Sequence, residues 1–510
     1  MRHVSKKSAL AITLLIVLAA PNYTFGEQPE QHKKKAPDVR ITADWDKVLR
    51  VSNTNATLQA VVTPLMSPKS PLQGKVWGAL TDLNASYVRY VPWLPYPKLA
   101  VAELEPPANG ETSWDFSRID PYTEAFFKAN PQPSAIINFS TIPQWMFKTP
   151  GRIKYPDNPD QETWDYTQGT ELRDSSMKEL TDYYTRLVSW YTQGGFADEF
   201  GKRHDSGHHF KINYWEVFNE PDLEHSTTPQ QYTERYDAVA AAIRTVEPQM
   251  KFVGIALAEP AGLPDYFEYF LNAKNHKSEM PIDMISYHFY ATPAADQPVD
   301  SWQYTVFAQS EEFVGVAKYI DSIRRRLSPA TGVTIDEVGV IAPDDLFQSQ
   351  PGYVFKSFPS FYWTLCSAQY AYLYGELAKL GIDAVGSSAL MQRPGFFPSV
   401  SMMDWNNGKP NARYWGLKLI RDNFGPGDKI ISAMGSPTVY AFGVIRPDGK
   451  RKLLLVNMRN KATEVSVSGA TGSQEQRVDQ TTSYDPPASS RLTTDTVRLQ
   501  SFAVSVITLQ

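Results

Sequence analysis

The sequence predicts an α/β protein in which a closed (β/α)8 TIM barrel is followed by a C-terminal antiparallel β-sandwich. Two observations lead to this prediction. Between residues 57 and 425, eight short β-rich apolar runs alternate with longer stretches of helical pattern, and after residue 428 short alternating strands follow without helices. Strands that alternate with helices pair in parallel, and eight such units suggest a closed barrel. A doubly wound open sheet is the alternative, but no G-x-G-x-x-G turn follows the first strand.

The first 26 residues have the pattern of a cleaved signal peptide. Three basic residues precede an apolar run at residues 9–20, which is too short to span the roughly 30 Å hydrocarbon core of a bilayer. Residues 27–40 form a polar linker with no means of packing. No later stretch is long and apolar enough to span a membrane. The sequence therefore predicts a protein that is secreted or periplasmic.

Each expected barrel strand is a short run rich in apolar and β-branched residues. The eight runs lie at 57–62, 87–93, 134–140, 212–218, 252–257, 284–290, 332–338 and 384–391. The helical patterns between them include one that opens with Thr228 and Pro229, a pair that favours a helix start. We therefore assign residues 57–425 to the barrel.

A second domain is expected at residues 428–510. It contains runs of alternating pattern at 437–445, 450–458, 463–469, 494–500 and 502–509, which are typical of an antiparallel β-sandwich. Residues 41–56 include a further strand-like run, which is predicted to add an N-terminal strand to this domain. Because the domain contains no Trp, we interpret it as a support for the barrel rather than a carbohydrate-binding module.

Composition and charge narrow the range of partners. The formal net charge is −5, and removing the three positive charges of the signal leaves −8, which argues against a nucleic-acid partner. The aromatic content of 13% is high. Flat rings stack on sugar faces, so this excess suits carbohydrate contact, although core packing explains most of it.

Two glutamates stand where a barrel has its active site, at the C-terminal ends of its strands. Glu220 follows the fourth expected strand, and Glu337 lies at the end of the seventh. Two carboxylates that converge at one barrel mouth form a glycosidase pair, in which one protonates the leaving oxygen and the other attacks the anomeric carbon. We expect the two carboxyls about 5–5.5 Å apart.

The neighbours of these glutamates give two further expectations. Pro221 restricts the residue before it, so Glu220 is expected to be extended. Asp336 directly precedes Glu337. Because a strand alternates its faces, only one of these two acids is expected to point into the barrel.

With Asn219, Glu220 and Pro221 in "WEVFNEPD" and Glu337 in "IDEVGV", the sequence resembles glycoside hydrolase clan A. Within the clan it looks most like family 39, which includes β-xylosidases and α-L-iduronidases. The resemblance implies that Glu220 is the acid/base, that Glu337 rather than Asp336 is the nucleophile, and that Asn219 binds the sugar's 2-hydroxyl. It implies a retaining hydrolase that cleaves an equatorial, β-type bond in an oligo- or polysaccharide.

Further residues are candidates for the substrate site. Arg89 ends the second strand and matches a clan position that supports the nucleophile, while His288 and Tyr290 end the sixth strand and match positions that contact nucleophile and substrate. The loops after the third and eighth strands supply three more candidates to line the sugar pocket: Trp145, Gln392 and Trp405. The structural alternatives are a salt bridge for Arg89 and loop packing for each of the three loop candidates.

The sequence predicts no metal site and no cofactor. The run "HDSGHH" at residues 204–209 offers three imidazoles, but it precedes the fourth strand and so belongs to the opposite face of the barrel. Two alternatives stay open at this point, namely an endo-acting glycanase of the same clan and an inactive carbohydrate-binding barrel. The sugar, the linkage and the oligomeric state are also open.

Overall fold

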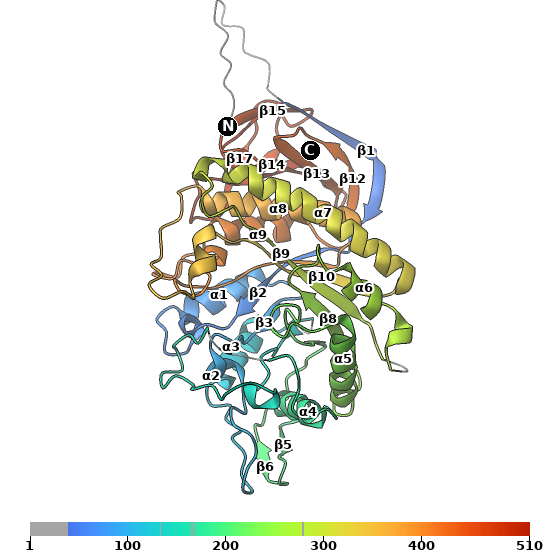
Figure 1. The fold of residues 1–510 in the computed structure, drawn as a ribbon. Coiled ribbons are helices and arrows are strands. Elements are labelled where there is room, and N and C mark those ends of the chain that lie inside the picture. The colour runs from blue at the N-terminus through green and yellow to red at the C-terminus, as the bar shows by residue number, and fades with distance from the viewer. Residues whose placement is uncertain (1–38, 133, 165, 167–168, 278–279) are drawn as a thin grey trace, which may run out of the picture. The chain divides into compact units, whose positions relative to one another are not determined.

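The computed structural model describes residues 39–132, 134–164, 166, 169–277 and 280–510. The predicted signal peptide, 1–26, and nearly all of the predicted linker, 27–40, lie outside these residues. In the described chain, eight parallel strands close a barrel in the order β10-β11-β2-β3-β4-β7-β8-β9; Figure 1 labels five of them, β2, β3, β8, β9 and β10. The barrel strands are β2 (Asn55–Val61), β3 (Arg89–Val91), β4 (Ile136–Ile137), β7 (Tyr214–Glu216), β8 (Lys251–Leu257), β9 (Met284–Ala291), β10 (Gly332–Val340) and β11 (Ala384–Ser387).

At least one helix follows each barrel strand, so the predicted alternation and fold class are confirmed. The helices are α1 (Gln73–Leu83), α2 (Pro97–Ala100), α3 (Asp120–Ala129), α4 (Lys178–Thr192), α5 (Pro229–Arg244), α6 (Pro264–Phe270), α7 (Trp302–Leu327), α8 (Tyr362–Leu380) and α9 (Ala412–Asn423). A hairpin of β5 (Gly195–Ala197) and β6 (Arg203–Asp205) precedes β7. Short 3-10 helices occur in the loops: η1 (Pro64–Met66), η2 (Gln144–Met146), η3 (Ala273–Asn275), η4 (Val299–Ser301), η5 (Pro343–Phe347) and η6 (Pro398–Val400).

Helix α5 begins where the sequence predicts. Thr228 is its N-cap, and its hydroxyl oxygen accepts a hydrogen bond from the Gln231 backbone N–H at 3.2 Å. The Gln231 side chain in turn accepts from the Thr228 N–H at 3.0 Å, and Pro229 fills the first turn, where an N–H is not needed. This reciprocal cap fixes the end of the loop that begins at β7.

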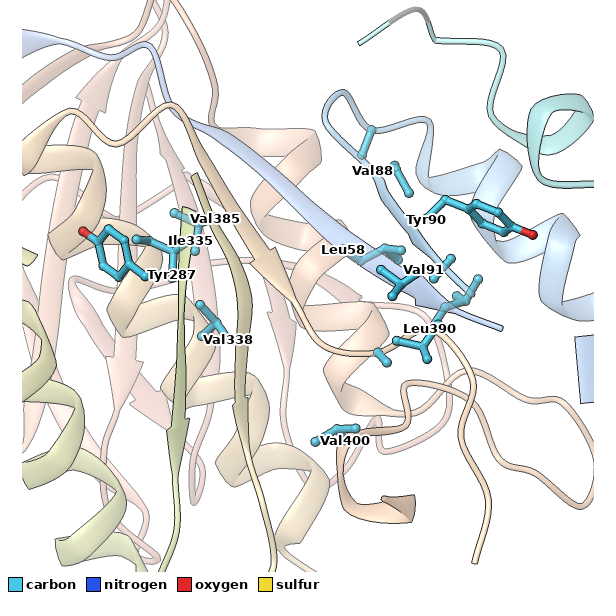
Figure 2. Close-up of a cluster of buried hydrophobic side chains, with 14 of the residues drawn as sticks. Leu58, Val88, Tyr90, Val91, Tyr287, Ile335, Val338, Val385, Leu390 and Val400 are labelled. Atoms are coloured by element: carbon cyan, nitrogen blue, oxygen red, sulfur yellow. The ribbon is translucent and has the colours of Figure 1, made fainter. Parts of the chain in front are cut away.

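Apolar side chains of the barrel strands form a buried cluster with the surrounding helices, in which Tyr90 packs on Phe126 of α3 and Tyr287 on Phe267 of α6. Figure 2 shows this cluster, which includes Leu58, Tyr90, Val91, Tyr287, Ile335, Val338 and Val385. Each of these side chains is at most 2% exposed. Strands covered on both faces are expected to be almost entirely apolar, so the buried polar residues on these strands need partners.

The C-terminal domain is a mostly antiparallel sheet in the order β17-β16-β19-β14-β13-β12-β1-β15-β18. Its strands are β1 (Val39–Val51), β12 (Lys429–Met434), β13 (Val439–Ile445), β14 (Arg451–Asn457), β15 (Thr463–Val467), β16 (Gln474–Val478), β17 (Ala488–Arg491), β18 (Thr496–Leu499) and β19 (Val504–Leu509). The strand from before the barrel, β1, pairs in parallel with β15 at its start and antiparallel with β12 along the rest.

The central strands of this sheet serve two cores, because successive side chains point to opposite faces. Alternate residues of β13, β14 and β19 pack with side chains of β15 and β18: Val439, Ala441, Leu453, Leu455, Ile507, Val465, Val497 and Leu499. The residues between them join the core of the barrel domain: Phe442, Val444, Leu454, Val456, Val504 and Val506. One face of the sheet and the barrel helices therefore enclose a single shared core.

Polar and aromatic contacts join the same surfaces. The ring centroids of Tyr372 in α8 and Tyr440 in β13 lie 5.1 Å apart, and the Lys379 ammonium lies 4.8 Å from the centre of the Tyr440 ring. Trp415 of α9 donates its indole N–H to the backbone oxygen of Tyr484 at 3.1 Å. Within the described residues, none of the helices has the length and hydropathy needed to cross a bilayer.

Candidate active site

Glu220 and Glu337 meet at the same end of the barrel. Glu220 lies in the loop after β7, and Glu337 lies within β10. One carboxylate oxygen of each lies within 4.8 Å of the other, and an imidazole nitrogen of His288 lies within the same distance of both. The two predicted carboxylates thus share one site, together with His288 of β9.

The backbone at Glu220 differs from the extended conformation predicted from Pro221. Glu220 has a φ of +39°, in the left-handed region. Its N–H donates to the Ala256 carbonyl at 2.9 Å, and its own carbonyl accepts from the N–H groups of Leu223 and Glu224 at 2.9 and 2.7 Å. A following proline favours extended backbone at the residue before it, so the hydrogen bonds of the turn hold Glu220 against that preference. The tight turn, rather than an extended chain, aims the side chain, at a cost of about 1–3 kcal/mol in backbone strain.

Arg89 of β3 is the hub of the polar network. It is 1% exposed and donates to Glu216 and Glu337 at 2.5 Å each. It also donates to the side-chain oxygens of Gln59 at 2.9 Å and Asn219 at 2.6 Å. A buried guanidinium is tolerated only when its donors are matched in this way. Arg89 therefore supports the nucleophile candidate and lies beneath the pocket rather than in its lining.

Asp336 and Glu337 both face the barrel interior, so the prediction that only one of them does is wrong. Asp336 Oδ2 lies 3.2 Å from Arg89 Nε, while Glu337 Oε1 lies 2.5 Å from Arg89 Nη1. The register between β10 and β9 shifts between Thr334 and Glu337. Such a bulge breaks the alternation of faces, and the two adjacent acids therefore reach the same cation.

Asp336 forms a buried pair with Glu216 of β7. Burial, and then the charge of Glu216, raise the pKa of Asp336 well above its usual value. Burial acts in the same direction on Glu216, but Arg89 and hydrogen bonds, one of them with Asp336, bring the pKa of Glu216 below its usual value. These opposed pKa shifts favour a protonated Asp336 that hydrogen-bonds an ionised Glu216 beneath the site.

Glu337 is held in its ionised form. Burial alone would raise the pKa of Glu337, but the charges of His288 and Arg89 and a hydrogen bond from Tyr290 bring it below its usual value. The Tyr290 hydroxyl donates to Glu337 Oε2 at 2.5 Å. With Arg89 bound to Oε1, each oxygen of this carboxylate accepts a strong hydrogen bond.

Glu220 has the opposite tendency. Burial raises the pKa of its carboxyl; His288 opposes this, and the negative charge of Glu337 adds to it, so the net shift is upward. His288 Nδ1 lies 2.8 Å from Glu220 Oε1, and His288 Nε2 lies 3.5 Å from Asp336 Oδ1. Although burial lowers the pKa of His288, the surrounding carboxylates raise it to about 9. His288 is therefore an imidazolium at neutral pH.

Asn219 is oriented by two partners. Its side-chain oxygen accepts from Arg89, and its side-chain nitrogen donates to Glu224 Oε1 at 2.7 Å. The same Glu224 oxygen accepts from the Trp93 indole N–H at 2.7 Å. These contacts decide which end of the Asn219 amide faces the pocket.

A pocket of about 370 Å³ opens above the carboxylates. Of the predicted residues, Asn219, Glu220, Tyr290, Glu337 and Gln392 line it. The side-chain oxygen of Gln392 is buried and has no protein partner, so it is available to a ligand.

Two predicted pocket residues lie elsewhere. Trp145 donates its indole N–H to the backbone oxygen of Glu103 at 2.9 Å and has the Arg173 guanidinium 4.5 Å from its ring centre. Trp405 packs against the rings of Phe355 and Phe358 in a separate surface hollow. Loop packing, the alternative stated for both residues, describes their environment.

Several residues of the site were not selected from the sequence. Gln59, Trp93 and Ser388 line the pocket, and Glu216 and Glu224 support it: Glu216 bonds Arg89, and Glu224 bonds Asn219. Gln59 and Glu216 carried a visible signal, since each is a polar residue inside an otherwise apolar strand. Glu224 lies in a loop, where no pattern marked it, and Ser388 directly follows β11, inside the run 384–391 that was expected to be a strand.

Among the described residues, Glu220, His288 and Glu337 have the spacing to hold a metal ion. Within the protein the same atoms hydrogen-bond: Arg89 and Tyr290 donate to the two oxygens of Glu337, and His288 bonds Glu220 Oε1. The histidines of "HDSGHH" have separate partners: Asp198 for His204, Asp120 for His208 and the Thr192 backbone for His209.

The site can be compared with known proteins. Residues 187–339 match the family model of glycosyl hydrolases family 39. This span contains both Glu220 and Glu337, and the resemblance predicted from the Asn-Glu-Pro motif is confirmed. No curated protein matches the chain.

Solved structures of glycoside hydrolases match the barrel and the sheet domain together. A family 51 arabinofuranosidase from Xanthomonas axonopodis pv. citri has a TM-score of 0.64 at 12% identity, over 93% of this chain and 100% of that one. A family 39 β-xylosidase from Caulobacter crescentus has a TM-score of 0.57 at 15% identity, over 92% and 99%. A family 30 endoxylanase from Clostridium papyrosolvens C71 has a TM-score of 0.55 at 14% identity, over 92% and 100%. At these identities the likeness establishes a shared fold.

Proposed function

We propose that the chain is a retaining glycoside hydrolase that cleaves an equatorial, β-type glycosidic bond. The observation that carries this proposal is the carboxyl pair, whose oxygens lie within 4.8 Å and whose pKa values are shifted in opposite directions. Retaining enzymes hold their carboxyls about 5–5.5 Å apart, whereas inverting enzymes need roughly 6.5–9.5 Å to admit a water molecule. Opposed pKa shifts separate the acid from the nucleophile.

In the first step, ionised Glu337 attacks the anomeric carbon. The bond from that carbon to the leaving oxygen breaks, and Glu220 gives its proton to this oxygen. The products are a glycosyl ester on Glu337 and a free leaving group. The contacts of Arg89 and Tyr290 keep Glu337 charged and aimed before the attack.

In the second step, a water molecule attacks the same carbon from the side that the leaving group vacated. Glu220, now a carboxylate, accepts a proton from this water, and Glu337 leaves as a carboxylate. Because the negative charge of Glu337 had contributed to the raised pKa of Glu220, esterification of Glu337 lowers that pKa at the moment when a base is needed.

The proposed substrate is an oligo- or polysaccharide, and Asn219 is proposed to contact its 2-hydroxyl. An endo-acting glycanase of the same clan is the alternative within this chemistry. An inactive carbohydrate-binding barrel is disfavoured, because both carboxylates are present with the partners that each role requires.

We also propose that the protein is secreted or periplasmic, on the basis of its N-terminal basic and apolar segment. N-terminal sequencing of protein recovered outside the cytoplasm should begin near residue 27. Recovery of the uncleaved chain from the cytoplasm alone would contradict export.

Separate substitutions distinguish the two carboxylates. Glu337→Ala removes the attacking group, so cleavage should fall by several orders of magnitude for every substrate. Glu220→Ala removes proton donation, so an aryl glycoside with an acidic leaving group should still form the glycosyl-enzyme. The release of the sugar should then be slow, giving a burst followed by slow turnover.

Azide rescue reports the stereochemistry of each variant. Azide needs no base, so it should restore turnover of Glu220→Ala and give a β-glycosyl azide from a β-glycoside. In Glu337→Ala it should give the azide of inverted configuration. Glu111→Ala, at an exposed glutamate, is the matched control and should behave as the wild type. Exchanged behaviour would reverse the roles, and full activity in both variants would place the site elsewhere.

A further inference from the structure

The pocket above Glu220 and Glu337 has a polar floor and an apolar mouth. The floor carries Gln59, Asn219, Tyr290 and Ser388, which the network below holds in place, together with Gln392 and the buried apolar Val61 and Val91. The walls toward solvent come from the loops after β3, β7, β10 and β11, and their largest side chains are Trp93, Leu223, Ile341, Leu346 and Phe397. This division suits a substrate whose sugar ring lies on the floor and whose apolar group lies in the mouth.

Two of the wall residues are unusually exposed for their type. Leu223 is 56% exposed and Leu346 is 54% exposed, although both line a concave pocket. Large apolar side chains that gather at a hollow usually mark a surface that a ligand covers. Leu223 lies on the turn that aims Glu220, since its N–H donates to the Glu220 carbonyl at 2.9 Å. Leu346 belongs to η5, in the loop that follows the strand of Glu337.

The mouth offers little to a second sugar. Among the described residues that line the pocket, Glu259 is the one charged side chain apart from Glu220 and Glu337. The Trp93 indole N–H is already donated to Glu224 at 2.7 Å, so the ring offers a sugar a face to stack on but no hydrogen-bond donor. A sugar carries hydroxyls around its ring, and leaving them without partners in a desolvated mouth is unfavourable.

We propose that the leaving group of the natural substrate is a hydrophobic aglycone, such as an alkyl or polycyclic alcohol, rather than another sugar. This inference rests on the proposed function. The sugar that becomes bonded to Glu337 occupies the polar floor, and the group bonded to its anomeric oxygen extends past Glu220 into the mouth. There it covers Leu223 and Leu346, which gain from losing contact with water.

A series of alkyl glycosides tests this inference. Ethyl, butyl, hexyl and octyl β-glycosides of the sugar that the enzyme cleaves best share one bond and nearly equal leaving-group acidity. Differences in kcat/KM below micellar concentration then report contact with the aglycone. The value should rise about tenfold or more from ethyl to octyl. Leu223→Ser and Leu346→Ser should each reduce that rise by about threefold, whatever their effect on the ethyl glycoside.

Leu49→Ser is the matched control, because Leu49 is a 50% exposed leucine in β1 and does not line the pocket. It should leave the whole series unchanged. A flat series in the wild-type enzyme would overturn the inference, as would faster cleavage of a sugar-linked disaccharide than of the octyl glycoside.

Calorimetric titration separates this inference from the proposed function. The Glu337→Gln variant should bind octyl β-D-glucoside or octyl β-D-xyloside about tenfold more tightly than the ethyl compounds. If no aryl glycoside is cleaved by the wild type but the octyl compounds bind better, the proposed function fails and the apolar mouth stands. If glycosides are cleaved and chain length changes neither binding nor kcat/KM, the aglycone inference fails alone.

Discussion

His288 is the residue whose charge both carboxyls of the site experience. Its Nδ1 lies 2.8 Å from Glu220 and 3.6 Å from Glu337. As a cation it lowers the pKa of Glu220 and that of Glu337. It therefore acts on both limbs of the expected pH profile, the acid limb through ionisation of Glu337 and the alkaline limb through loss of the Glu220 proton.

Replacing His288 by Asn should move both limbs of the kcat/KM profile to higher pH. Without the imidazolium, the pKa of Glu337 rises, so the enzyme needs a higher pH to ionise its nucleophile. The pKa of Glu220 also rises, so the acid keeps its proton to a higher pH. Kinetics from pH 3 to 10 measure both limbs. His209→Asn, at an exposed histidine bonded to the Thr192 backbone, should leave them in place. An alkaline limb that moved downward would contradict the assignment.

At the scale of elements, the sequence predicted strands better than it predicted which side chains point inward. All eight barrel strands lie within or overlap the predicted runs because buried parallel strands need apolar residues on both faces. In the C-terminal sheet, β12, β16 and β17 were missed. The polar "QEQRV" of β16 shows why, since two of its side chains are buried by contacts with other strands and not by a local apolar pattern.

The bulge in β10 and the loops over the mouth could not be predicted from sequence. Asp336 points inward because the register of β10 shifts, and a register depends on the neighbouring strand. Trp145 and Trp405 follow the correct strands but fold away from the pocket. Loop sequence gives position along the chain, whereas the path of each loop is decided by the loops that pack against it.

The loop between α2 and α3 contains Glu103, a carboxyl that the site does not use. It is 0% exposed, and neither side-chain oxygen has a hydrogen-bond partner. Burial raises its pKa to about 8. The unfolded chain releases this proton near a pH of about 4.3, so stability falls as pH rises from there through 8.

Glu103→Gln should therefore stabilise the protein only at higher pH. The amide cannot ionise in either state, so the melting temperature should match the wild type near pH 4 and exceed it by about 2–4 °C at pH 8. Thermal unfolding at both pH values is the measurement. Glu105→Gln, at an exposed position two residues away, should show no such dependence, and an equal gain at both pH values would refute the explanation.

At the scale of the whole molecule, the barrel and the C-terminal sheet share a core. Phe442 is 1% exposed and belongs to the same cluster as the barrel helices, while its neighbour Ala441 faces the second layer of the sheet. Removing residues 428–510 would expose the sheet-facing sides of α8 and α9 to water.

We therefore expect one cooperative unfolding transition for the described part of the chain. Calorimetry of the full protein should show a single peak, and Phe442→Ala should destabilise barrel and sheet together by about 3–5 kcal/mol. The circular dichroism signals of helix and of strand should shift to the same lower temperature. Two separated transitions would show that the sheet is an independent module.

The position of β1 in the sheet has a consequence for the order of synthesis. β1 ends at Val51, and its partners β12 and β15 begin at Lys429 and Thr463. At roughly 5–20 residues per second, tens of seconds pass before a ribosome delivers either partner. During that time residues 39–51 have neither of the strands with which they pair in the folded sheet. The sheet cannot close before the last strands are made, so the C-terminal domain completes its fold only when translation is nearly finished.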